Sequence, residues 1–230
     1  MNSRPWAAVL FDFGGTLDGD GIHWSRRFDS TFRSMELSYA PEALDDAFRA
    51  SERVVNSDPA VKAMNLPAVI RYQCALMLRD LGHPTEAVAD DAGRRLTLET
   101  RDYLGRNSAV LRLLKGRVKT GILSNFTGNL EIILREEGLL ALVDSVFDSA
   151  VVGLRKPDPA FFRHALSSLG AAPGETAMVG DSVDMDLRPA GALGLSTVWI
   201  QGAIPRATDF RPDHTLENVR EFPSLWGETI

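Results

Sequence analysis

The chain has 230 residues, a length that suits one large domain or one domain with a sizeable insertion. Its 25 Lys and Arg against 31 Asp and Glu give a formal charge of −6, and 44% hydrophobic against 24% charged residues is the balance of an ordinary globular protein. This composition excludes an intrinsically disordered chain. An acidic balance without a Lys/Arg cluster also argues against nucleic acid or an anionic membrane as the main partner.

The cellular compartment is indicated by three features. Cys74 is the single cysteine, so it has no partner for a disulfide within the chain and suits a reducing compartment. No apolar run approaches the roughly 18 residues that a membrane span needs. The N-terminal sequence MNSRPWAAVLFDFGG lacks the apolar stretch and cleavage site of a secretory signal. We therefore expect a cytoplasmic protein.

Short apolar runs that end in glycine or polar residues predict buried strands of a parallel sheet. In chain order these runs cover residues 7–11, 118–123, 146–152, 177–179 and 197–200, and the third is the weakest. Helices are predicted over residues 128–137 with Thr127 as the N-cap, over the segment that Pro157 and Pro159 open and Gly170 closes, and over residues 184–193, where Pro189 must kink or end the helix. This alternation predicts a three-layer α/β core with a mainly parallel central sheet.

Residues from about 22 to 105 show helical periodicity and no convincing strand. Pro41, Pro67 and Pro84 divide this segment into about four helices, and Cys74 lies at helical spacing among apolar residues that predict a core position. An all-helical insert therefore interrupts the α/β domain just after its first strand. We place the catalytic core at residues 1–20 and 106–230 and a helical cap at residues 21–105.

Polar residues at the carboxyl ends of the predicted strands form a candidate site, because ligands of open parallel sheets bind there. They are Asp12, Ser124, Asn125 and Asp181, with Lys156 on a loop and Asp186 five residues after Asp181. Three neighbouring carboxylates repel one another unless a cation neutralises them, and ligation by oxygen alone is what Mg²⁺ selects. A hydroxyl and an ammonium would then bind phosphoryl oxygens, and the Asp12 carboxylate can act as a nucleophile that forms an acyl phosphate.

The strings LFDFGGTLD, GILSN, RKPDP and GDSVDMD, in this order, resemble the four motifs of the haloacid dehalogenase superfamily of aspartate-nucleophile hydrolases. RKPDPAFF and GDSVDMDLRPAGALG are similar to the branch that includes phosphoglycolate phosphatase and L-2-haloacid dehalogenase. The resemblance implies a Rossmann-like core, with a helical cap in the place of the insert predicted above.

The resemblance also implies roles for individual residues. Asp12 would be the nucleophile and a direct metal ligand. Ser124 and the backbone amide of Asn125 would bind the transferring phosphoryl group, and Lys156 would hold the charge of Asp12 and of the phosphoryl oxygens. Asp181 would bind Mg²⁺ directly.

Other positions follow from the same motifs. Asp186 would bind Mg²⁺ directly or through water, and it is preferred over Asp184 because it alone matches the family spacing. Gly15 and Thr16 would shape the flexible turn beneath the cap and bring Gly15 near the substrate. Gly14 would supply its backbone carbonyl to the metal.

Gly14 is also a departure from the family pattern. The family's phosphatases usually carry an aspartate there, the general acid/base that protonates the leaving group, and such help is typically worth about 10²- to 10⁴-fold in rate. Asp18, Asp20 or His23, all near the first cap hinge, are candidates for a substitute proton donor.

The residues after this hinge have two interpretations. His23 and its neighbours Trp24, Arg26 and Arg27 either face the substrate or belong to the helix that begins there. Trp24 is better explained by helix packing, and the two arginines by a solvated helix face.

The leading interpretation is a Mg²⁺-dependent phosphatase that hydrolyses a small phosphorylated metabolite through an aspartyl-phosphate on Asp12. A weakened or inactive scaffold that binds a phospho-ligand or a protein partner draws its support from Gly14. A 2-haloacid dehalogenase is disfavoured by the presence of both Asp181 and Asp186, because that chemistry needs no cation. We expect a monomer or homodimer, with Trp6 and Trp226 packed against another chain or against the core.

Overall fold

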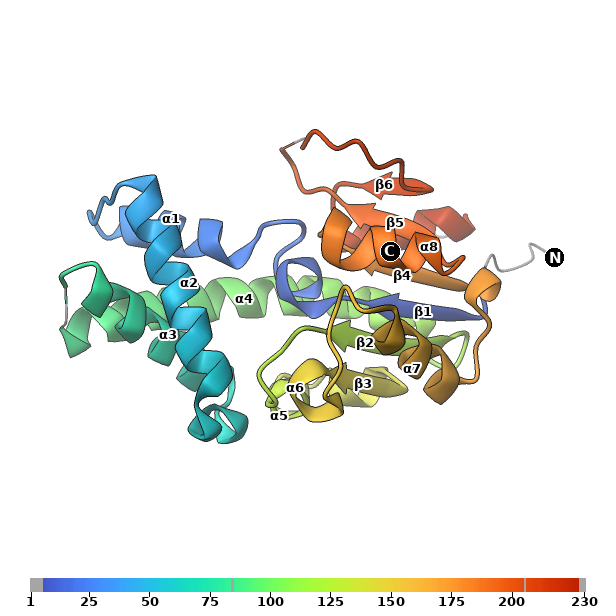
Figure 1. The fold of residues 1–230 in the computed structure, drawn as a ribbon, viewed down its shortest axis with the longest axis horizontal. Helices are drawn as coiled ribbons and strands as arrows, with labels where there is room; N and C mark the ends of the chain where they lie inside the picture. The colour runs from blue at the N-terminus through green and yellow to red at the C-terminus, as the bar shows by residue number, and fades with distance from the viewer. Residues whose placement is uncertain (1–5, 84, 205, 228–230) are drawn as a thin grey trace.

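The computed structural model describes residues 6–83, 85–204 and 206–227. Within them, six parallel strands form one sheet in the order β3-β2-β1-β4-β5-β6 (Figure 1). The strands are β1 (Ala8–Phe11), β2 (Lys119–Ser124), β3 (Ser145–Asp148), β4 (Thr176–Gly180), β5 (Ser196–Ile200) and β6 (His214–Leu216). The expectation of an α/β core with a mainly parallel sheet is confirmed.

Helices pack on the sheet and extend beyond it. Those of the insert between β1 and β2 are α1 (Trp24–Ser34), α2 (Pro41–Ser57), α3 (Leu66–Asp80) and α4 (Glu86–Leu114). The remaining helices are α5 (Leu130–Glu136), α6 (Ser149–Val152), α7 (Pro159–Leu169) and α8 (Arg188–Ala192), with short helical turns at Pro59–Ala63, Leu140–Leu142, Pro173–Glu175 and Val219–Trp226.

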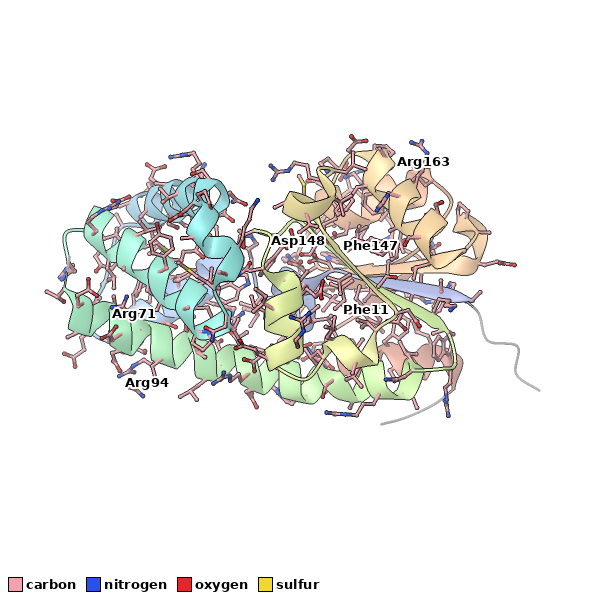
Figure 2. The ribbon with its side chains drawn as sticks, turned by 90° about the horizontal axis from the view of Figure 1, so that it is seen from below. Phe11, Arg71, Arg94, Phe147, Asp148 and Arg163 are labelled. Atoms are coloured by element: carbon pink, nitrogen blue, oxygen red, sulfur yellow. The ribbon has the colours of Figure 1, made fainter. Side chains whose placement is uncertain are left out.

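Both faces of the sheet are buried, which explains why its strands are continuous apolar runs. On one face Leu10 and Met178 pack with Phe162 of α7. On the other face Phe11 and Val179 belong to a larger core that continues through α4 into the insert. Figure 2 shows Phe11 and Phe147 among the side chains between these layers.

The helical insert is joined to the sheet by α4, which runs from the insert along the core in Figure 1. Within the insert, Arg71 of α3, which is labelled in Figure 2, forms ion pairs with Glu86 and Asp90 of α4. Because α4 is one continuous helix over Glu86–Leu114, it crosses residue 105 without a break. The division into a core at 1–20 and 106–230 and a cap at 21–105 stays a prediction.

Local expectations near Asp148 were wrong in two places. The predicted strand over 146–152 ends at Asp148, and α6 follows because Asp148 Oδ1 accepts from Ala150 N at 2.9 Å. Thr127 does not cap α5; its hydroxyl donates to Asn129 Oδ1 at 2.6 Å instead. The Asp148 carboxylate takes that function by accepting from Leu130 N at 3.2 Å.

The structure also differs from the expectations for Pro189 and for the last strand, and it agrees with the expectation for Cys74. Pro189 does not kink a single helix over 184–193; it lies at the start of α8, after a separate turn at Val183–Leu187. The sequence pattern missed β6, which has only three residues. Cys74 is fully buried in the core as expected, and burial raises the pKa of its thiol to about 12.

The two terminal tryptophans lie against each other. Trp6 is buried, with its ring centroid 6.2 Å from that of Trp226, so packing within the chain is the interpretation that the structure supports. Among the described residues, no helix combines the length and the apolar character needed to cross a bilayer.

Candidate active site

Three strand ends bring polar side chains to one edge of the sheet. Asp12 follows β1, Ser124 ends β2 and Asp181 follows β4. These ends coincide because β1 pairs in parallel with both neighbours, and Asp12 N extends the ladder by donating to Val179 O at 2.9 Å. Ser124 Oγ donates to Asp12 Oδ1 at 3.1 Å. The structure therefore brings together residues more than a hundred positions apart.

Lys156 lies at the centre of this group. Its ammonium is 2.6 Å from Asp12 Oδ1 and 2.6 Å from Asp186 Oδ1, and the side chain is only 3% exposed. Burial alone would lower the pKa of Lys156, but the carboxylates of Asp12 and Asp186 raise it above its usual range. Lys156 is therefore a permanent cation that two carboxylates share.

Asn125 holds the loop that carries Lys156. Its Nδ2 donates to Lys156 O at 2.9 Å, and its Oδ1 accepts from Lys156 N at 2.8 Å. The side chain thus positions the lysine. The proposed contact of the Asn125 amide with a phosphoryl group concerns its backbone and stays a prediction.

Asp12, Asp181 and Asp186 form a buried triad that offers one ligand oxygen each, all within 4.8 Å of one another. Burial raises the pKa of Asp181 well above its usual range, and the negative charges of Asp12 and Asp186 raise it further. Burial also raises the pKa of Asp186 to about 6, although Lys156 opposes the shift. A hard divalent cation fits this donor set, because three oxygen ligands and a surplus of buried negative charge are what it neutralises.

Close backbone packing shapes the triad. At Gly180 an added Cβ would lie 2.5 Å from Asp186 Oδ2, so only glycine lets the Asp186 carboxylate lie against the end of β4. Asp184, the competing acid, is exposed and pairs with Arg188 at 2.9 Å. The structure therefore places Asp186, and not Asp184, in the triad. Gly180 is a position that the sequence analysis missed, although it precedes Asp181 in the motif GDSVDMD.

Two further side chains hold Asp181. Thr16 Oγ1 accepts from Asp181 N at 3.0 Å and lies 3.3 Å from Asp12 Oδ2, so it ties the turn Phe13–Leu17 to both acids. Arg206 donates through Nη2 to Asp181 O at 2.9 Å, and its Nη1 is 3.9 Å from Asp181 Oδ2. Sequence reasoning missed Arg206 because it lies in an irregular segment outside every motif.

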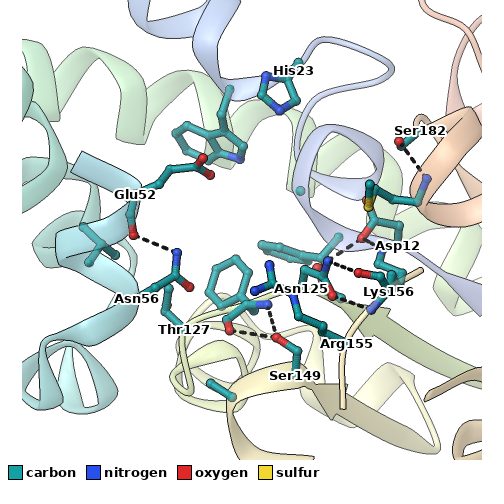
Figure 3. A pocket seen from close by; sticks show the side chains of 18 of the residues that line it. Asp12, His23, Glu52, Asn56, Asn125, Thr127, Ser149, Arg155, Lys156 and Ser182 are labelled. Atoms are coloured by element: carbon teal, nitrogen blue, oxygen red, sulfur yellow. Dashed lines mark hydrogen bonds and ion pairs between the residues drawn. The ribbon is translucent and has the colours of Figure 1, made fainter. Parts of the chain in front are cut away.

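A cavity of about 640 Å³ opens between the sheet edge and the helical insert. Its sheet side includes Asp12, Ser124 and Lys156, and its insert side includes His23, Trp24 and Glu52. Figure 3 shows His23 and Glu52 across the cavity from Asp12 and Lys156. Glu52 was not singled out from the sequence, because on α2 it has the pattern of any exposed helix residue.

The three candidate proton donors occupy different places. Asp18 is fully buried and accepts from Gly15 N at 2.6 Å and Trp24 Nε1 at 3.0 Å. Asp20 is also buried and accepts from Asn107 Nδ2 at 2.9 Å. Among the three, only His23 is part of the wall of the main cavity.

The interpretation of Arg27 as a solvated residue was wrong. Its side chain is 1% exposed, donates to Asp18 O at 2.9 Å and stacks on Trp24 with its Cζ 4.2 Å from the ring centroid. Trp24 packs on Phe28 with a centroid distance of 5.8 Å, as the helix-packing interpretation expected, but it also lines the cavity. The burial of Arg27 depends on partners distant in the chain, which helical periodicity does not reveal.

The motifs and this geometry have counterparts in known proteins. The family model of haloacid dehalogenase-like hydrolases matches residues 6–194, most of the chain. The chain belongs to the haloacid dehalogenase-like hydrolases.

Several curated members of this family are similar in sequence. The chain is 35% identical over 128 residues to phosphoserine phosphatase of Thermus thermophilus, a match that spans 54% of this chain and only 51% of that protein. It is 28% identical to ribulose-1,5-bisphosphate 5-phosphatase of Halopiger xanaduensis, with 95% of this chain and 98% of that protein covered. The family resemblance inferred from the motifs is confirmed.

Solved structures share the fold. One dehalogenase crystal structure superposes with a TM-score of 0.66 at 21% identity, covering 99% of this chain and all of the other. The magnesium-bound HAD-hydrolase YfnB of Bacillus subtilis superposes with a TM-score of 0.59 at 16% identity, covering 98% of this chain and 100% of that one. At these identities the likeness concerns the fold.

Proposed function

We propose that this protein is a Mg²⁺-dependent phosphatase that hydrolyses a small phosphorylated metabolite through an aspartyl-phosphate on Asp12. The observation that carries the proposal is the ion-pair arrangement in which Lys156 Nζ lies 2.6 Å from both Asp12 and Asp186. This arrangement orients the Asp12 carboxylate against a buried ammonium within the acidic triad. The phosphatase names of its curated relatives support the same reaction class.

The chemistry follows from the residues present. Bound Mg²⁺, held by Asp12, Asp181 and Asp186, would supply positive charge to the phosphoryl oxygens. The Asp12 carboxylate forms a bond to phosphorus while the ester P–O bond breaks, and the departing oxygen takes a proton. Water then attacks phosphorus, the bond to Asp12 breaks, and inorganic phosphate leaves with the carboxylate restored.

Lys156 and Ser124 stabilise the charge in this sequence of steps. The ammonium of Lys156 faces the oxygen atoms of Asp12 and is positioned to bind a phosphoryl oxygen as charge develops. The hydroxyl of Ser124 lies 3.1 Å from the same oxygen, Asp12 Oδ1, and offers a neutral donor. Both side chains are buried and already point at Asp12.

The cavity supports a substrate of metabolite size. Its volume of about 640 Å³ is in the range of sites for small molecules, and its walls combine apolar side chains with a few polar ones. The curated relatives include enzymes named for phosphoserine, for N-acylneuraminate 9-phosphate and for ribulose 1,5-bisphosphate. A panel of phosphorylated amino acids and sugars is therefore the screen for the substrate.

The test is the release of phosphate from p-nitrophenyl phosphate with Mg²⁺ and with EDTA. We expect turnover that needs the metal and that Asp12→Asn lowers by at least about 10³-fold, because the nucleophile is lost. Asp184→Asn is the matched control, since Asp184 is exposed and outside the triad, and should retain full activity. Binding of phosphate esters without turnover of any of them would favour the scaffold alternative and contradict the proposal.

The proposal also covers the cellular compartment and the oligomeric state of the protein. We infer a cytoplasmic enzyme, supported by the single buried cysteine, that acts as a monomer or homodimer. Light scattering after size exclusion measures the assembly.

A further inference from the structure

Gly14 leaves this site without a side chain where a proton donor for the leaving group would be expected. A Cβ built on Gly14 would meet the Trp24 ring at 3.7 Å, so the indole lies beside the vacant position. Trp24 itself does not replace the missing group, because its Nε1–H already donates to Asp18 Oδ2 at 3.0 Å. The proton must come from another part of the cavity.

The in-line geometry of phosphoryl transfer indicates which side of the cavity must supply this proton. Attack by Asp12 proceeds in line, so the departing oxygen lies on the far side of phosphorus, toward the helical insert. Of the described insert residues that line the cavity, His23 and Glu52 are the ones that titrate. Asp18 and Asp20 are buried outside it.

His23 has one ring nitrogen held and the other available. Its Nδ1 accepts from Ser25 N at 3.2 Å and lies 2.9 Å from Ser25 Oγ. Without a proton, Nδ1 accepts from Ser25 N; with a proton, it gives up that hydrogen bond and donates to Ser25 Oγ instead. No hydrogen bond to Nε2 occurs within the part of the chain that the structure describes, and the ring packs edge-on against Phe48 at 5.6 Å between centroids.

The charges around His23 suit an exchange of protons during turnover. The surrounding atoms desolvate His23 in part and lower its pKa although its side chain is still accessible to solvent; Arg206 and Arg26 lower the pKa further, while Asp12 and Asp45 act in the opposite direction. The balance of these influences favours the neutral imidazole before a substrate binds. An anionic phosphate ester that enters the cavity beside His23 adds negative charge and favours the imidazolium.

We propose that His23 Nε2 exchanges the proton of this reaction in place of the side chain that Gly14 lacks. This inference rests on the proposed phosphatase function. In the first step the imidazolium gives its Nε2 proton to the ester oxygen as the P–O bond breaks, and becomes neutral. In the second step Nε2 takes a proton from the attacking water, the bond between phosphorus and Asp12 breaks, and the imidazolium is restored.

Glu52 is the rival donor on the same wall. Its pKa is raised by burial, as a carboxylic acid donor would need, and Arg155 opposes the shift. His23 is favoured because it adjoins Trp24, whose ring lies 3.7 Å from a Cβ built on Gly14, whereas Glu52 belongs to α2. Replacing His23 and replacing Glu52 should therefore have different effects on the hydrolysis of alkyl phosphates.

The experiment compares His23→Gln and Glu52→Gln on an aryl and an alkyl phosphate in the presence of Mg²⁺. The aryl probe is p-nitrophenyl phosphate, whose leaving group departs as a stable anion and needs no acid. The alkyl probe is whichever of ethyl phosphate, glycerol 3-phosphate and phosphoserine competes most strongly with it. We expect His23→Gln to lower kcat on the alkyl ester about 10²-fold and on the aryl ester less than about threefold.

A matched control and a pH profile separate proton transfer from a structural effect. His83→Gln, whose ring packs on Tyr39 outside the cavity, should leave both rates unchanged. The wild-type kcat on the alkyl ester should fall at high pH as the imidazolium is lost, and this limb should disappear in His23→Gln. A change that only loosens α1 would lower both substrates alike and leave the pH limb in place.

Three results would overturn the inference while leaving the proposed function standing. They are equal losses on the two esters in His23→Gln, a selective loss in Glu52→Gln but not in His23→Gln, and alkyl esters that inhibit wild-type enzyme without being hydrolysed. Failure of wild-type enzyme to hydrolyse p-nitrophenyl phosphate would instead overturn the proposed function itself.

Discussion

At the scale of single residues, two adjacent glycines have opposite tolerance for a side chain. Gly14 has φ −72° and ψ 116°, which any residue adopts, and a Cβ there makes only ordinary contact with Trp24. Gly15 has φ +85°, and a Cβ would lie 3.0 Å from the Asp181 carboxylate. Position 14 therefore has room for a side chain and a backbone that any residue adopts, whereas position 15 has neither.

This contrast makes Gly14→Asp a gain-of-function prediction. The added carboxyl group sits beside the reacting centre and supplies a general acid, so kcat on alkyl phosphates should rise about tenfold or more over Gly14→Ala. The steady-state rate with each alkyl ester measures it. Gly15→Ala, made in parallel, should lose activity because Asp181 is displaced; equal effects of all three substitutions would show that the turn, and not the acid, determines the rate.

Side chains at strand ends were predictable from the sequence, and those that depend on distant packing were not. Asp12, Ser124 and Asp181 each follow an apolar run, so their meeting at one sheet edge follows from parallel topology alone. Arg206 belongs to no periodic segment. The burial of Arg27 requires acceptors at Asp18, just after the Phe13–Leu17 turn, and at Thr100 of α4, and no local pattern predicts either contact.

At the scale of elements, a buried ion pair ties the turn Phe13–Leu17 to the insert. Arg27 of α1 lies 3.8 Å from Asp18 and donates to Thr100 of α4 at 2.5 Å. Asp18 accepts from Gly15 N, so the same carboxylate fixes the turn that carries Gly14. The network therefore links the position of the insert to the shape of the turn beside Asp12.

Asp18 should make stability depend on pH in a defined direction. Burial raises its pKa from 3.8 to about 6 despite Arg27, so its contribution to the free energy of unfolding is present below pH 4 and lost as pH rises through about 6. Relative to Asp18→Asn, the wild type should lose up to about 3 kcal/mol between pH 4 and pH 7. Urea unfolding of both proteins at a series of pH values measures this difference. The titration of every other group contributes equally to both proteins and therefore cancels.

Asp29→Asn is the control for the Asp18→Asn comparison. Asp29→Asn lies on the same helix, where Asp29 pairs with Arg33 near the surface, and its difference from wild type should stay nearly constant over that range. If the wild type kept a constant stability relative to Asp18→Asn over this range, or gained stability as pH rose, Arg27 would outweigh burial and the carboxylate would be charged in the folded protein.

At the scale of the whole molecule, the sheet edge collects acids from separate parts of the chain, so metal binding and folding must be coupled. Asp12 comes from the start of the chain, and Asp181 and Asp186 come from residues that follow α7. In the metal-free protein burial and mutual repulsion raise the pKa values of Asp181 and Asp186. Their charged forms therefore destabilise the fold as pH rises, and a bound cation reverses that effect.

Mg²⁺ should consequently stabilise the protein more at pH 8 than at pH 5.5. Asp186, with a pKa of about 6, is protonated at the lower pH and loses its ligand oxygen there. Binding only to the folded state adds about 2.7 kcal/mol when Mg²⁺ is at a hundred times its Kd, which appears as a rise in Tm over an EDTA sample of equal ionic strength. Asp186→Asn should lose most of this rise at pH 8, and Asp184→Asn should keep it. If Mg²⁺ raised the Tm of Asp186→Asn as much as that of the wild type, the cation would bind elsewhere on the molecule. The positive charge that Asp12 needs to attack phosphorus would then be absent from the triad.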